Sequence, residues 1–186
     1  MTSTDAQTVV AHVQPPPVHV MLDLETLGKE PGCAILSIGA VAFSRAGLGS
    51  SFYCTIEHPV GRIDSETVLW WLQQSEAARA ALFAAPRLNH FDAVARFRDW
   101  FRGIGARYLW SHGAGFDEPI FRNAFLSKPP WSYRDVRCAR TLYRLAGLSS
   151  KDFGDPAAAH DALADATAQA LAAVAALNKI GWPAEE

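Results

Sequence analysis

Two carboxylates separated by one residue, Asp23 and Glu25, stand at the end of an apolar segment that runs from Val18 to Leu24. Such a segment predicts a β-strand, on which side chains at positions i and i+2 point to the same face. Two like charges held that close repel each other and are costly to desolvate. Mg²⁺ or Mn²⁺ would offset both costs, because these ions prefer carboxylate oxygens. The alternative is an exposed strand end with two solvated acids.

Two further acidic positions occur later in the chain. Asp117 follows the glycine-rich turn 113–115, where a helix is predicted to begin, so it has the alternative role of a first-turn acid favoured by the helix dipole. Asp161 and Asp165 are four residues apart in an alanine-rich segment that predicts a helix over 157–178, and they would share one face of it.

His160 directly precedes this second acidic pair. A histidine beside an acidic cluster can act as a general base for water, because its pKa lies near neutrality. The alternative is a solvated helix start with an incidental histidine.

The elements that must position these residues follow from the hydrophobic pattern. Closely spaced apolar segments at the start of the chain predict an antiparallel meander, and segments of helical periodicity follow. Together they predict an α/β fold, a mixed sheet with helices around it. We expect strands over 18–24, 34–43, 51–56, 107–111 and 133–136, and helices over 64–73, 75–83, 89–103, 117–126, 137–145 and 157–178.

Length and composition limit the function classes. The 186 residues fit one domain, which we place at 18–180 after a flexible N-terminal segment at 1–17. A formal net charge of −2 gives no overall attraction to nucleic acid, so a polyanion-binding protein would need local basic patches or metal ions. The three cysteines form no C-x-x-C pair, which argues against a disulfide framework and a zinc site and favours a reducing, cytoplasmic setting. Neither a secretory signal nor a membrane-spanning segment is predicted.

The chemistry-bearing residues, with their spacing, resemble the histidine-containing DEDD (DEDDh) exonucleases. Within that group the chain looks most like the phage and bacterial branch of exonuclease VIII-like and ribonuclease T-like enzymes, and the similarity spans nearly all of 18–177. The resemblance rests on segments 22–26, 35–41, 67–79, 110–117 and 130–142, and on His160, Asp165, Ala166 and Gln169 in the last motif.

The resemblance implies a ribonuclease H-like α/β fold, in which an antiparallel meander and parallel strands form one mixed sheet flanked by helices. It also implies 3′→5′ exonuclease activity that hydrolyses the terminal phosphodiester of single-stranded DNA or RNA, or of a 3′ overhang, and releases nucleoside 5′-monophosphates. In this family four acids hold two Mg²⁺ or Mn²⁺ ions and a histidine is the general base. Carried over to this sequence, the acids are Asp23, Glu25, Asp117 and Asp165, and the base is His160.

Asp161 is excluded from this set by the family spacing and is expected to be a first-turn acid. Two departures from the family pattern bear on substrate preference. Ser111-His112 stands where asparagine is common, and Glu118 follows Asp117 where relatives often have asparagine. Neither departure removes a metal ligand, and Glu118 is a further candidate metal contact.

Substrate contacts are expected directly after Glu25, at the tryptophan pair and at two arginines. The resemblance implies that the residues after Glu25 line a pocket for the 3′-terminal nucleotide. Adjacent helical side chains point about 100° apart, so we expect one of Trp70 and Trp71 in the core and at most one stacking on a base; the alternative buries both. The candidate substrate-binding residues are Thr26, Leu27, Gly28, Trp70, Phe116, Arg137 and Arg140.

Arg137, Arg140 and Arg144 would form a basic stripe on one helix, which is either a solvated face or a patch that follows phosphates. Related enzymes are often dimers, so a homodimer is a further expectation. Two alternatives from other classes are a catalytically silent nucleic-acid-binding module on the same fold and a small-substrate phosphatase. The complete set of acids and histidine disfavours the first, and no nucleophile motif supports the second. DNA and RNA are not distinguished, because a single group can read the 2′-hydroxyl.

Overall fold

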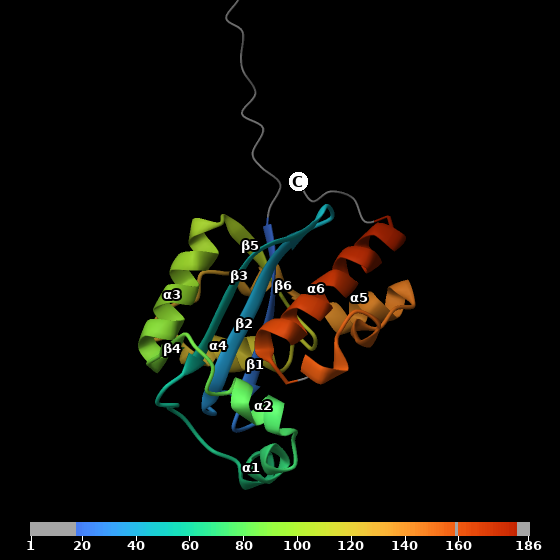
Figure 1. Cartoon of the computed structure of the whole chain (residues 1–186). Helices are drawn as coiled ribbons and strands as arrows, with labels where there is room; N and C mark the ends of the chain where they lie inside the picture. The colour runs from blue at the N-terminus through green and yellow to red at the C-terminus, as the bar shows by residue number, and fades with distance from the viewer. Residues whose placement is uncertain (1–17, 159, 182–186) are drawn as a thin grey trace, which may run out of the picture.

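The computed structural model describes residues 18–158 and 160–181, so the N-terminal segment predicted at 1–17 lies outside the described residues. In the described chain one mixed sheet has the strand order β4-β3-β2-β1-β5-β6 (Figure 1). The strands are β1 (Val18–Thr26), β2 (Ile35–Ser44), β3 (Gly47–Ile56), β4 (Arg87–Leu88), β5 (Ala106–Ser111) and β6 (Val136–Cys138).

The strand directions confirm the predicted combination of a meander and parallel strands. β1, β2 and β3 pair antiparallel in chain order. β5 pairs parallel with β1, and β6 pairs parallel with β5. β4 adds a parallel strand at the other edge. β1 therefore lies inside the sheet, between an antiparallel and a parallel neighbour.

Helices cover both faces of the sheet, α1 lies beyond its end at the bottom of Figure 1, and α2 lies beside that end. None of the described helices combines the length and the apolar character that crossing a membrane requires. The helices are α1 (Ser65–Leu72), α2 (Glu76–Ala81), α3 (His90–Gly103), α4 (Asp117–Ala124), α5 (Ala139–Ala146) and α6 (Ala162–Lys179), with 3₁₀ turns η1 (Tyr133–Asp135), η2 (Ser150–Asp152) and η3 (Pro156–Ala158).

The two faces of β1 belong to two different cores. Val20 and Leu22 pack in the cluster that contains Phe97 of α3 and residues of α4. Met21 packs in the other cluster, with residues of α5 and α6. Because side chains alternate along a strand, Asp23 and Glu25 follow Met21 and face the layer of α5 and α6.

Gly39 lets α6 approach this face closely. Gly39 is the register partner of Asp23 on β2, and a Cβ added to it would lie 2.1 Å from the backbone carbon of Ala162. No other residue fits so close a backbone approach. The start of α6 is thus held against the sheet beside Asp23.

Several predicted boundaries were wrong, and the third strand, predicted at 51–56, already begins at Gly47. The last strand, predicted at 133–136, begins at Val136, because Ser132 caps the preceding turn by accepting a hydrogen bond from the Arg134 N–H. The helix predicted at 157–178 begins at Ala162. There Asp161 is the N-cap and accepts from two backbone N–H groups, so it lies before the first turn rather than within it. β4 was not predicted, since two residues carry no periodicity.

Candidate active site

The first two acids come from the end of β1, and a third is tied to the same strand. Glu25 is buried and Asp23 is partly exposed. Asp117 is buried at the first position of α4, and its Oδ1 accepts a hydrogen bond from the Leu24 N–H at 3.2 Å. The backbone between Asp23 and Glu25 therefore fixes the third carboxylate.

His160 and Asp165 come from the start of α6 and the turn before it. His160 has a left-handed backbone with φ of 66°, and its N–H donates to Oδ2 of Asp165 at 3.1 Å. Its ring lies edge-on to Trp70, with 4.8 Å between the ring centroids. One ligand atom each from Glu25, His160 and Asp165 lies within 4.8 Å of the others, a spacing that could hold a metal ion.

All five residues predicted for catalysis line a single hollow of about 260 Å³. They come from separate segments of the chain that the sheet and α6 bring together. The lining consists of Asp23, Glu25, Asp117, His160 and Asp165, together with Leu24, His112, Gly113, Phe116, Arg140 and Gln169.

Burial favours the protonated forms of these acids, and repulsion between carboxylates adds to it at Asp23 and Glu25. Burial, followed by the charges of Asp165 and Asp117, raises the pKa of Glu25 to about 8. Burial raises the pKa of Asp117 to about 7, although the Leu24 N–H and the Arg140 guanidinium act in the opposite direction.

The other two acids shift in the same direction. Burial holds the pKa of Asp23 well above its ordinary value, and neighbouring carboxylates add to the effect, whereas a hydrogen bond from Gln169 opposes it. Burial also raises the pKa of Asp165. Clustered carboxylates with an imidazole match the donors that hard divalent cations take, so the residues present fit the metal site that the sequence predicts.

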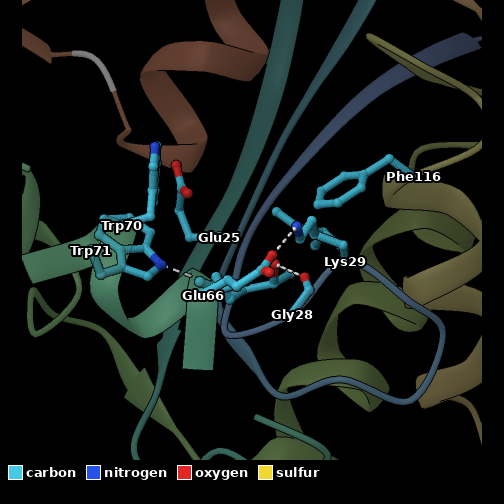
Figure 2. A pocket seen from close by; sticks show the side chains of 10 residues that line it. Glu25, Gly28, Lys29, Glu66, Trp70, Trp71 and Phe116 are labelled. Carbon is cyan, nitrogen blue, oxygen red and sulfur yellow. Dashed lines mark hydrogen bonds and ion pairs between the residues drawn. The ribbon is translucent and has the colours of Figure 1, made fainter. Parts of the chain in front are cut away.

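A second hollow of about 490 Å³ adjoins the acids and shares Leu24, Glu25 and Phe116 with the first. Trp70 and Trp71 line one side of it, and Phe116 and Lys29 line the opposite side (Figure 2). Its apolar walls and its contact with the acids suit a nucleotide base beside a reacting phosphate.

The structure confirms that one tryptophan of the pair lies in the core, and stacking of the other on a base stays a prediction. Trp71 is 5% exposed, and its Nε1 donates to the Thr26 carbonyl oxygen at 2.9 Å. Trp70 is 41% exposed. Trp71 therefore fixes the backbone at the end of β1, and Trp70 offers its ring to the pocket.

The loop after β1 also forms part of this pocket. Thr26 and Gly28 line it, and the Thr26 hydroxyl donates to the Gly28 carbonyl oxygen at 2.6 Å. A Cβ on Gly28 would lie 2.6 Å from the Cβ of Cys33, so glycine keeps this loop packed. Leu27 is half-buried and does not belong to the lining.

The predicted arginine stripe on one helix was wrong, because Arg137 lies on β6 and only Arg140 and Arg144 lie on α5. Arg140 lines the hollow of the acids. The Arg137 guanidinium instead packs over the Tyr108 ring at 4.6 Å and donates to the Arg134 carbonyl oxygen at 2.7 Å.

Glu118 does not face the acids. It is buried, and its Oε1 accepts hydrogen bonds from Nε of Arg122 and Nε1 of Trp131, each at 2.7 Å. The Trp131 contact ties α4 to the segment after it, and Glu118 does not line the hollow of the acids, so the candidate metal contact at Glu118 was wrong.

Gln169 is a site residue to which the sequence assigned no role. Its Nε2 donates to Oδ1 of Asp23 at 2.8 Å. The signal in the sequence was its position four residues after Asp165 on the same helix, which places both side chains on one face.

Comparison with known proteins identifies the family. Residues 18–177 match the family described as the 3′-5′ exoribonuclease Rv2179c-like domain. The chain belongs to this family. The protein is thus a 3′→5′ exonuclease, as the sequence predicted.

Solved structures share the fold at low sequence identity. Exonuclease X, in complex with 5′ overhanging duplex DNA, is 19% identical with a TM-score of 0.61, over 89% of this chain and 95% of that one. Exonuclease I from E. coli, in complex with a dT13 oligonucleotide, is 19% identical with a TM-score of 0.60, over 91% of this chain and 42% of that one.

The nuclease domain of 3′hExo, a DEDDh family member bound to rAMP, is 13% identical with a TM-score of 0.55, over 88% of this chain and 92% of that one. These likenesses confirm the ribonuclease H-like fold. No curated protein gave a significant match. The DEDDh exonucleases generally use divalent metal ions, and Glu25, His160 and Asp165 of this chain are spaced so that they could hold one.

Proposed function

We propose that this protein removes nucleotides one at a time from the 3′ end of single-stranded RNA or DNA, or of a 3′ overhang, and releases nucleoside 5′-monophosphates. One observation carries the proposal. Four carboxylates and a histidine from separate segments line one hollow, and an aromatic-walled pocket opens beside it.

The four acids Asp23, Glu25, Asp117 and Asp165 would hold two Mg²⁺ or Mn²⁺ ions. When bound, such ions supply positive charge that stabilises the attacking and leaving oxygens of an in-line displacement. They would also offset the burial that raises the pKa values of these acids, and the repulsion between carboxylates that adds to it at Asp23 and Glu25.

His160 would take the proton from the attacking water. Its backbone is tied to Asp165, and its ring stands against Trp70 at the mouth of the hollow. His160 has a left-handed backbone, a conformation that is uncommon for residues other than glycine and that clusters at active sites, which supports this role.

The 3′-terminal nucleotide would enter the pocket beside Glu25, with its base between Trp70 and Phe116. Arg140, which lines the hollow of the acids, would contact a phosphate of the substrate. Arg137 is a weaker candidate for that contact, since it packs on Tyr108.

RNA is the first substrate to test, because the matching family is described as exoribonuclease. DNA is the second, since Exonuclease X and Exonuclease I were solved with DNA. The homodimer and the cytoplasmic location stay predictions, and light scattering in solution tests the first.

The experiment uses 5′-labelled oligonucleotides of one sequence as RNA, DNA and duplex, each with a free or a blocked 3′ end. With Mg²⁺ or Mn²⁺, we expect a ladder that shortens from the free 3′ end. Chelation of the metal and the 3′ block should each prevent it. Persistence of every unblocked strand in the presence of metal would disprove the proposal.

A further inference from the structure

Gln169 is a buried polar side chain that faces the acids without being a metal ligand. It lies on α6, one turn after Asp165, and is 7% exposed. Its Nε2 donates to Oδ1 of Asp23 at 2.8 Å across 146 positions of sequence. A helix that supplies one acid therefore also supplies a hydrogen-bond donor to another.

Three of the four acids, Asp23, Asp117 and Asp165, each accept a hydrogen bond from an identified donor group. The Leu24 N–H holds Asp117, and the His160 N–H holds Asp165. In the described part of the chain, the Gln169 amide is the group shown to donate a side-chain hydrogen bond to Asp23. The first two donors belong to the backbone, which substitution does not remove, whereas the third depends on the identity of one side chain.

Asp23 lies in surroundings that disfavour its carboxylate form. Burial raises the pKa of Asp23, the charges of Asp117, Glu25 and Asp165 add to that rise, and the Gln169 hydrogen bond opposes it. A neutral amide thus stabilises the carboxylate without adding a charge that would compete with a cation. A lysine or arginine here would hold Asp23 but would also repel the ion.

The carbonyl end of the same amide is buried as well. Oε1 of Gln169 is buried and has no hydrogen-bond partner among the described residues. Gln169 lines the hollow of the acids and also a neighbouring hollow of about 300 Å³. Since buried polar atoms are normally hydrogen-bonded, a water between these hollows is the expected partner of Oε1.

We propose that Gln169 is a positioning residue that holds the Asp23 carboxylate in the orientation that binds a divalent cation. The inference rests on the proposed metal-dependent function. Groups that orient metal ligands are worth about 10–100-fold in metal affinity or activity, so loss of the donor should weaken metal binding by a factor in that range.

The test measures Mn²⁺ binding to the full chain by electron paramagnetic resonance, without nucleic acid. Gln169→Met keeps the length of the side chain and removes both polar groups, and Gln169→Leu removes them with a shorter side chain. Asn178→Leu is the matched control, because it removes an amide from the same helix that pairs with Arg45 rather than with an acid.

We expect the dissociation constant for Mn²⁺ to rise about 10–100-fold in both Gln169 variants and to stay unchanged in Asn178→Leu. The melting temperature of the metal-free protein should change little, and excess Mn²⁺ should restore nuclease activity. A merely structural role would instead lower the melting temperature and leave the metal affinity as it was.

If either Gln169 variant folds and binds Mn²⁺ as tightly as the wild type does, the inference is overturned. An equal loss of affinity in Asn178→Leu does so as well. A wild-type protein that binds no Mn²⁺ would instead overturn the proposed function itself, so the two failures are distinguishable.

Discussion

The backbone N–H of His160 donates a hydrogen bond to Oδ2 of Asp165 at 3.1 Å. The residue predicted to be the base is therefore tied, through its main chain, to a residue predicted to hold metal. Removal of the imidazole should leave this bond in place, which separates the two roles experimentally.

His160→Asn tests the role of the base. Asparagine tolerates the left-handed backbone at this position better than alanine does. We expect kcat to fall by about 10²–10⁴-fold while the protein stays folded. The measurement is the rate of nucleotide release as a function of pH, and an unchanged rate near neutral pH would remove His160 from the mechanism.

The two adjacent tryptophans should respond differently to truncation. Trp70→Ala removes an exposed pocket wall, so it should raise KM for the oligonucleotide and change the melting temperature little. Trp71→Ala removes a buried ring and its hydrogen bond to Thr26, at a cost of about 3–5 kcal/mol in the free energy of unfolding. Kinetics and thermal melting of both variants check this, and the reverse pattern would contradict the placement.

The placement of the chemistry-bearing residues was easier to predict from the sequence than the exact ends of the helices and strands. The spacing of Asp23 and Glu25 on an apolar strand fixed their shared face, because the β period is strict. The start of β6 was misplaced because the capping of a turn by Ser132 decides it, and no periodicity reveals such a cap. The role of Gln169 was hidden because its partner, Asp23, is distant in sequence.

Stability of the metal-free protein should decrease as pH rises. Glu25 has a pKa of about 8 and Asp117 of about 7 in the folded chain, whereas unfolded Glu and Asp titrate near 4. Between about pH 4 and pH 8 the folded state therefore binds more protons than the unfolded state, so the free energy of unfolding falls with rising pH.

Thermal melting from pH 5 to pH 8, with chelator or with Mg²⁺, checks this prediction. The melting temperature with chelator should fall across the range, and the rise caused by Mg²⁺ should be largest at pH 8, where protons compete least. A melting temperature that increases steadily to pH 8 in chelator would contradict the clustering of buried acids.

Glu25→Gln should stabilise the metal-free protein at pH 8, because it removes a buried charge that Asp165 and Asp117 repel. A gain of about 1 kcal/mol would raise the melting temperature of a domain of this size by about 2–4 °C. The same variant should lose the stabilisation by Mg²⁺. Thermal melting with chelator and with metal measures both effects, and a destabilised metal-free variant would show that the repulsion is absent.

Asp161 and Asp165 provide the most direct test of the central claim, that the acids of this hollow hold the metal for 3′→5′ hydrolysis. Asp161 caps α6 and does not line the hollow, and asparagine caps a helix as well as aspartate does. The measurement is release of nucleoside 5′-monophosphate from a free 3′ end, with Mn²⁺ affinity determined on the same samples. Asp165→Asn should abolish release and weaken Mn²⁺ binding, whereas Asp161→Asn should keep both near the wild-type level. Wild-type release by a folded Asp165→Asn variant would contradict the account.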